Sequence, residues 1–158
     1  MKARYQVKTV VFLCIFREIE GCHQVLLQLR QNTGYMDGKY DFAVSGHVES
    51  GESMLQAIIR EAKEEADLII NPENCIFLTF VDDTYERYHK GFFGVREYEG
   101  APKVMEPDKC AGYIWADLNN LPKNIIPYLP KVLRNISLKI PYDDEKFSLQ
   151  QHITNCSY

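Results

Sequence analysis

Residues 46–68 read GHVESGESMLQAIIREAKEEADL, and the fold prediction starts from this stretch. Apolar side chains recur in it at helical spacing: Leu55, Ile58, Ile59, Ala62 and Ala66. This pattern predicts a helix that starts near Ser53, with Glu52 and Ser53 as candidates for its N-cap. Glu61, Glu64 and Glu65 share a second face, about a third of the helix circumference. Because like charges on one face repel, the pattern favours a bound divalent cation such as Mg²⁺, which prefers carboxylate oxygens.

Further strands and one further helix are predicted around this helix. Runs rich in Val, Ile, Phe and Tyr predict strands over residues 4–17, 25–29, 40–44, 75–81, 85–98 and 111–116. Residues 31–38 are rich in Gly, Asn and Asp, which predicts a loop. Prolines precede a second helix over about residues 128–136, and the polar tail after Pro141 reads as an edge strand. This order predicts an α/β fold, a sandwich with a mixed sheet between helices, in one domain over residues 1–158.

Composition narrows the classes of function. The net charge of −4 argues against general binding of nucleic-acid backbones, whereas small phosphorylated ligands fit if a metal ion screens them. The five cysteines are odd in number and never spaced as C-x-x-C, which favours reduced thiols and a cytoplasmic protein. The apolar run at residues 10–16 is too short to span a bilayer and lacks a signal-peptide cleavage site. We therefore expect neither a membrane nor a nucleic-acid partner.

The spacing of polar residues within 46–68 resembles the Nudix box, G-x5-E-x7-R-E-U-x-E-E-x-G-U, where U is a bulky aliphatic residue. The matching residues are Gly46, Glu52, Arg60, Glu61, Glu64, Glu65 and Leu68. Softer resemblance covers most of the remaining chain. Asp67 replaces the last glycine of the box, and Val44-Ser45-Gly46 replaces the usual Pro-Gly-Gly. Neither departure removes a charged group from the pattern, and Asp67 should affect stability more than chemistry.

The resemblance implies a Nudix-type α/β/α sandwich that hydrolyses a nucleoside diphosphate linked to another moiety. It further implies Mg²⁺, for which Mn²⁺ could substitute, and a set of catalytic residues: Glu52, Arg60, Glu61, Glu64 and Glu65. The metal ligands would be Glu61, Glu64, Glu65 and the backbone carbonyl of Ser45. Arg60 would pair with Glu52 or a box glutamate, and a glutamate in the cleft would take a proton from the attacking water. The sequence does not say which glutamate does so.

Four residues outside this set have competing interpretations. Glu106 is either a further metal ligand or a solvated loop residue. Arg30 is a candidate for contact with a phosphate or a base. Asn124 could read a base edge or cap the following helix. His47 is more readily a hydrogen-bonded loop residue than a ligand. One or two of five tyrosines could stack on a base: Tyr35, Tyr40, Tyr85, Tyr88 and Tyr98.

Other functions stay open at this level. An acidic helix face alone is usually a solvated surface, and here the spacing of Gly46 and Glu52 argues against that interpretation. The main alternative is a catalytically inactive nucleotide-binding module on the same fold. An isomerase would need a cysteine and a glutamate placed for proton transfer. The substrate is open, with nucleoside triphosphates slightly ahead of nucleotide sugars, and an exposed apolar N-terminal strand could support a homodimer.

Overall fold

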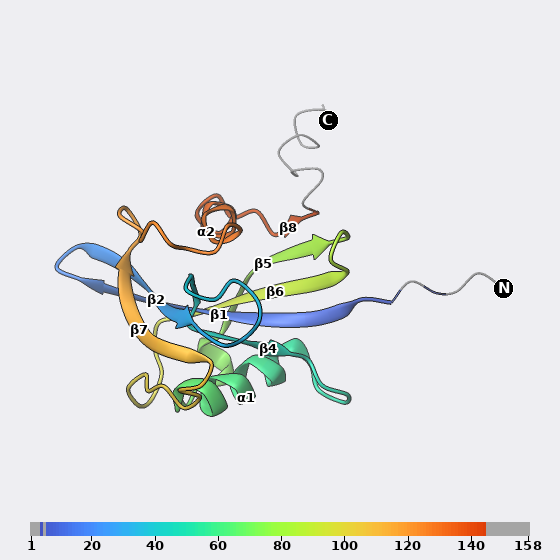
Figure 1. Cartoon of the computed structure of the whole chain (residues 1–158), viewed down its shortest axis with the longest axis horizontal. Helices are drawn as coiled ribbons and strands as arrows, with labels where there is room; N and C mark the ends of the chain where they lie inside the picture. The colour runs from blue at the N-terminus through green and yellow to red at the C-terminus, as the bar shows by residue number, and fades with distance from the viewer. Residues whose placement is uncertain (1–3, 5, 145–158) are drawn as a thin grey trace.

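The computed structural model describes residue 4 and residues 6–144 (Figure 1). Two α-helices are described, α1 (Met54–Ala66) and α2 (Leu129–Ser137), with a short 3-10 helix at Pro72–Asn74. The strands are β1 (Lys8–Ile19), β2 (Cys22–Arg30), β3 (Tyr40–Phe42), β4 (Val44–His47), β5 (Ile76–Asp83), β6 (Tyr88–Val95), β7 (Cys110–Asp117) and β8 (Tyr142–Asp143). No helix in this part of the chain is long and apolar enough to cross a bilayer.

A mixed sheet separates the two helices. Its main path runs β3-β2-β1-β6-β5-β8, while β4 pairs with β1 and β7 pairs with β2. The β1–β6 and β5–β8 pairs are parallel, and the remaining pairs are antiparallel. Figure 1 shows α1 and α2 on opposite faces of this sheet, each over its own buried core. The predicted α/β sandwich with a mixed sheet between helices is confirmed.

The long strand β1 joins the two parts of the sheet. Its first half pairs with β4 and β6, and its second half pairs with β2. Val11, Leu13 and Ile15 alternate with Phe12 and Cys14, and all five side chains are buried because both faces of the strand are covered. The strand therefore fixes the position of β4, which leads into the acidic helix.

Two predicted strands differ from those in the structure. The predicted strand over residues 40–44 is two strands, because β3 pairs with β2 whereas β4 crosses over to pair with β1. The predicted strand over 85–98 is shorter, because the chain turns before Tyr88. In that turn Asp83 accepts a hydrogen bond from the N–H of Glu86 (2.8 Å), and Arg87 has a φ of 61°.

The ends of α1 are set by local interactions. Ser53 is the N-cap, and its hydroxyl accepts from the N–H of Gln56 while the Gln56 side chain accepts from the N–H of Ser53. Glu52 instead pairs with Arg60. Asp67 is the C-cap, with a φ of 55° in the left-handed region that the missing glycine would favour. Asp67 therefore adopts the left-handed conformation that the last glycine of the box would adopt.

Replacing Asp67 with glycine should stabilise the protein. Glycine relieves the left-handed strain, so we expect a gain of about 0.5–1 kcal/mol in the free energy of unfolding, measured in urea. Asp67→Ala is the matched control, and it should lose stability because alanine keeps the Cβ without the tolerance of Asp. A less stable Asp67→Gly variant would contradict this account of the C-cap.

Candidate active site

Arg60 lies at the centre of the acidic face of α1. Its Nε and Nη2 donate to the two carboxylate oxygens of Glu52, at 3.2 and 2.8 Å. Its Nη1 donates to Glu61 Oε1 (2.8 Å) and Glu64 Oε2 (3.0 Å), and its Nη2 also donates to the carbonyl of His47 (3.1 Å). Its hydrogen bonds to these carboxylates, above all to Glu52, raise the pKa of Arg60, and burial opposes that shift. One guanidinium thus ties the loop after β4 to the glutamates of the helix.

Gly46 gives Glu61 the space it occupies. A Cβ built on Gly46 would lie 2.0 Å from Glu61 Oε1 and 2.1 Å from its carboxyl carbon. The lack of a side chain on β4 therefore allows the Glu61 carboxylate to lie directly over the strand. Burial raises the pKa of Glu61, while its hydrogen bond from Arg60 opposes that shift.

Glu65 lies deeper, against the start of β4. Its Oε2 accepts a hydrogen bond from the N–H of Ser45 (3.0 Å). Burial is the main cause that raises the pKa of Glu65 to about 8, and the negative charges of Glu61 and Glu106 add to it, whereas the Ser45 N–H opposes it. A cation bound nearby would stabilise the ionised form of a carboxylate in these surroundings.

The loop before β7 brings Glu106 to the same side. The N–H groups of Lys103 and Met105 donate to the carbonyls of Ala66 (3.0 Å) and Glu65 (3.1 Å), which fastens the loop to the end of α1. Glu106 pairs with Lys109, whose Nζ lies 2.9 Å from Glu106 Oε1. Glu106 is thus close enough to the box to act on the charges of its glutamates.

The donors fit a hard divalent cation in kind. They are carboxylate oxygens together with the carbonyl of Ser45, the ligand type that Mg²⁺ prefers. As the side chains lie, no group of three or more Asp, Glu, His or Cys within residues 4 and 6–144 is spaced to hold a metal ion. Glu61 and Glu64 instead have Arg60 as their partner.

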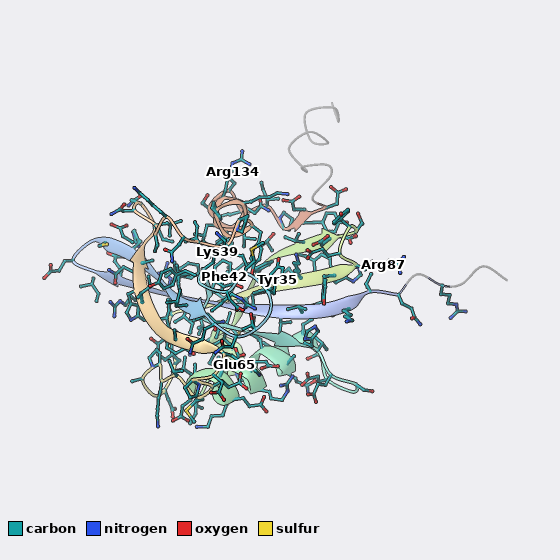
Figure 2. The ribbon with its side chains drawn as sticks, in the orientation of Figure 1. Tyr35, Lys39, Phe42, Glu65, Arg87 and Arg134 are labelled. Carbon is teal, nitrogen blue, oxygen red and sulfur yellow. The ribbon has the colours of Figure 1, made fainter. Side chains whose placement is uncertain are left out.

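A cavity of about 470 Å³ opens beside these glutamates. Figure 2 shows Glu65 on the α1 side and Tyr35 on the loop in front of the sheet, and both line the cavity. Its other lining residues are Val10, Phe12, Gln28, Arg30, Thr33, Asp41, Ser45, Gly46, His47, Tyr88, Lys90, Lys109 and Tyr128. A larger hollow of about 840 Å³ lies by α2 and the β1–β2 hairpin, away from the box. We place the site in the smaller cavity, because it adjoins the acidic helix.

The end of the cavity away from Glu65 contains a second polar group. Asp41 is 2% exposed and accepts from the hydroxyl of Tyr128 (2.5 Å) and from the N–H of Phe42 (2.8 Å), both on Oδ1. Burial raises the pKa of Asp41, and these donors oppose the shift. Lys90 is buried nearby, with its Nζ 2.8 Å from Asp83 Oδ2. The cavity thus has an acidic end at the box and a mixed end at β3 and α2.

The predicted residues outside the box lie in different places. Arg30 lines the cavity and donates to the carbonyl of Tyr35 and to Thr33, so it also holds the loop at residues 31–37. Asn124 lies outside the cavity lining and donates to the carbonyl of Gly38 (3.1 Å). It does not cap α2, whose N-cap is Tyr128. His47, at the end of β4, is exposed and lines the cavity.

The lining residues that sequence reasoning missed include several polar ones: Gln28, Asp41, Lys90, Lys109 and Tyr128. Gln28 and Lys90 each stand within an apolar strand segment, and a polar residue in a buried strand needs a partner or a ligand. That signal could have found these two. Asp41 and Tyr128 lie 87 residues apart, and their pairing leaves no local pattern.

Comparisons with known proteins place the chain in a family. A family model described as the NUDIX domain matches residues 7–136. The NAD-capped RNA hydrolase NudC of Stutzerimonas stutzeri is 30% identical over 97 residues, 61% of this chain, and the chain matches only 33% of its length. The chain also resembles solved structures. The two described next are less than 25% identical to it, so their likeness concerns the fold alone.

Two solved structures illustrate that likeness of fold. A MutT NUDIX hydrolase from Burkholderia pseudomallei has a TM-score of 0.72 and 23% identity, covering 83% of this chain and 98% of its own. The NUDIX domain of Shewanella oneidensis NrtR, complexed with ADP ribose, has a TM-score of 0.64 and 17% identity, covering 87% and 90%. Together with the family match over most of its length, these findings show that the chain belongs to the Nudix hydrolase family.

Proposed function

We propose that the protein is an Mg²⁺-dependent pyrophosphohydrolase of nucleotides. Its substrate would be a nucleoside di- or triphosphate, or a nucleoside diphosphate linked to another moiety, and one product would be phosphate or a phosphorylated fragment. The observation that carries this proposal is the position of the acidic helix. Arg60 holds Glu52, Glu61 and Glu64 beside the half-buried Glu65, at one end of a cavity large enough for a nucleotide.

Glu61, Glu64, Glu65 and the carbonyl of Ser45 would hold the metal, with Glu106 as a further ligand. When bound, Mg²⁺ (or Mn²⁺) neutralises phosphate charge and makes a coordinated water more acidic. One glutamate of the cavity takes up the proton of the attacking water. Arg60 acts through Glu61 and Glu64 by keeping them in position, because both share its guanidinium with Glu52.

The rest of the cavity suits a nucleotide. Tyr35, Tyr88 and Tyr128 supply aromatic faces for a base, and Lys109 supplies a cation near the box glutamates. The NrtR domain is a family relative that has been seen with ADP ribose, which supports a nucleotide derivative as ligand. NudC supports the same general kind of substrate, although the chain matches only a third of that protein. A cytoplasmic setting and a homodimer remain predictions.

The alternative function is a nucleotide-binding module without hydrolysis. Retention of Arg60 and of all four box glutamates argues against it, because binding alone needs no such set. An isomerase is less well supported, since none of the described cysteines lines the cavity.

A nucleotide panel tests the proposal. With Mg²⁺, the purified protein should release phosphate, pyrophosphate or a monophosphate from at least one nucleoside triphosphate, nucleotide sugar or dinucleotide, measured by ion-exchange chromatography. Removing the metal with EDTA should abolish release, and added Mg²⁺ should restore it. Tight binding of a nucleotide without turnover of any panel member would favour the binding module instead.

A further inference from the structure

We infer that Arg30 and Asp41 form a donor–acceptor pair that binds the lactam edge of a nucleobase. A lactam edge is an adjacent C=O and N–H, as in guanine, hypoxanthine and uracil. Adenine and cytosine present an amino group and a ring nitrogen acceptor there instead. The inference rests on the proposed function, because it places a base in the same cavity whose other end would hold the phosphates.

Arg30 supplies the donor. Its side chain is 16% exposed, and two of its three nitrogens are used within the loop at residues 31–37. Nε donates to the carbonyl of Tyr35 (2.9 Å), and Nη2 donates to Thr33 Oγ1 (3.0 Å). These bonds fix the guanidinium plane, while Nη1 has no hydrogen-bond acceptor among the described residues. A rigid donor that lines a cavity and lacks an acceptor is suited to a ligand carbonyl.

Asp41 supplies the acceptor beside it. Oδ1 already accepts from the Tyr128 hydroxyl and the Phe42 N–H. Among the described residues, the ion-pair partner of Oδ2 is Arg30 Nη1, at 3.6 Å, which is too long for a hydrogen bond. Arg30 and Asp41 therefore form an ion pair but leave the hydrogen-bonding capacity of Nη1 and Oδ2 unused. A C=O and an N–H on neighbouring atoms of one ring could bond to both.

The surroundings favour a base over a phosphate at this end. The carboxylate of Asp41 would repel a phosphate brought to Arg30, and the ammonium of Lys90 is neutralised by Asp83 at 2.8 Å. Phe12 and Tyr128 pack edge to face with ring centroids 5.8 Å apart and, with Tyr35, give this end of the cavity aromatic walls. Glu65 and Lys109 lie at the other end, where phosphates and metal would sit.

Inosine and adenosine monophosphates test the pair, because their bases differ only at this edge. Titration calorimetry without metal should show IMP binding at least about tenfold more tightly than AMP. In the orientation that the ribose phosphate gives to both bases, adenine sets its amino group against the Arg30 donor and its ring nitrogen against the Asp41 carboxylate, so neither is satisfied. UMP should likewise bind more tightly than CMP. Equal binding within either pair, or no binding of any of the four, would overturn the inference. Binding is measured without turnover, so failure of hydrolysis leaves this result standing.

Asp41→Asn probes the acceptor itself. Phe42 N–H and the Tyr128 hydroxyl both donate to Oδ1, so the amide oxygen should stay there and put the NH₂ beside Arg30. Two adjacent donors no longer match a lactam, and the preference for IMP over AMP should vanish. Asp117→Asn makes the same change outside the cavity and should keep the preference. Retention of the preference in a folded Asp41→Asn variant would overturn the inference, and the wild-type comparison decides it if that variant does not fold.

Discussion

Replacing Glu65 with glutamine should lower kcat by at least about 1,000-fold and leave the protein folded. The amide keeps the size of the side chain, and its oxygen can still accept from the N–H of Ser45, 3.0 Å away in the wild type. What it loses is a negative charge at a half-buried position beside Glu61 and Glu106, where a metal ion would be held. Initial rates on whichever nucleotide the panel identifies measure the loss.

Glu64→Gln should lower kcat in the same way, for a different structural reason. Glu64 is largely exposed and pairs with Arg60 at 3.0 Å, so its removal costs little stability and takes away one candidate metal ligand. Glu49→Gln is the matched control. Glu49 is exposed on the loop after β4, and its contacts with the box are made by its backbone: its N–H donates to Glu52 Oε1 and its carbonyl accepts from the N–H of Glu52. Its activity should stay at the wild-type level.

Unchanged activity in both Glu64→Gln and Glu65→Gln would sink the metal assignment. Loss of activity in Glu49→Gln as well would mean that net negative charge near the cavity, rather than the box positions, decides the rate. A second readout separates catalysis from binding. If the glutamates hold metal, the magnesium concentration for half-maximal rate should rise in any variant that retains measurable turnover.

The sequence predicted the parts of the site that depend on local spacing. The acidic face and apolar stripe of α1 lie within one helix, and its N-cap Ser53 and C-cap Asp67 act within a few residues. A helix fixes which residues share a face, so such a pattern can be recognised in the sequence without knowledge of the tertiary structure. The fold class followed from the order of the elements for the same reason.

The mixed end of the cavity could not be predicted, because it is made by distant pairs. Asp41 and Tyr128 are hydrogen-bonded although they lie 87 residues apart, and the sequence around either residue does not indicate its partner. The split of the predicted strand at residues 40–44 has a similar cause, since it depends on β3 and β4 choosing different partners. Strand pairing between segments is set by the whole sheet and not by either segment alone.

Replacing Asp83 with asparagine should destabilise the protein by about 3 kcal/mol at pH 7, measured by urea unfolding. Asp83 and Lys90 are both buried, and the Nζ–Oδ2 distance is 2.8 Å. The variant leaves the Lys90 ammonium in the interior, and among the described residues its remaining ion-pair partner is Glu86, at 3.9 Å. Asp108→Asn, an exposed change, should stay within about 0.5 kcal/mol of the wild type.

The pH dependence of this loss identifies its cause. Burial alone would raise the pKa of Asp83, but the N–H of Glu86 and the Lys90 ammonium outweigh it and hold the pKa below its usual value. The ionised carboxyl therefore contributes stability above its unfolded pKa of about 3.9, and that contribution is lost as pH falls through the lower folded pKa. Protonated Asp83 resembles asparagine, so the gap between wild type and Asp83→Asn should close at acid pH. A gap that persists there would point to packing rather than charge.

Adding Lys90→Met to Asp83→Asn should recover most of the stability. A buried pair replaced by neutral groups of similar size is often no less stable, because the desolvation cost of both charges disappears with their attraction. Recovery would show that the single variant suffers from an uncompensated ammonium and not from loss of a large net attraction. Stability alone would then not explain why the pair is present. Its role would lie in the cavity, which Lys90 lines.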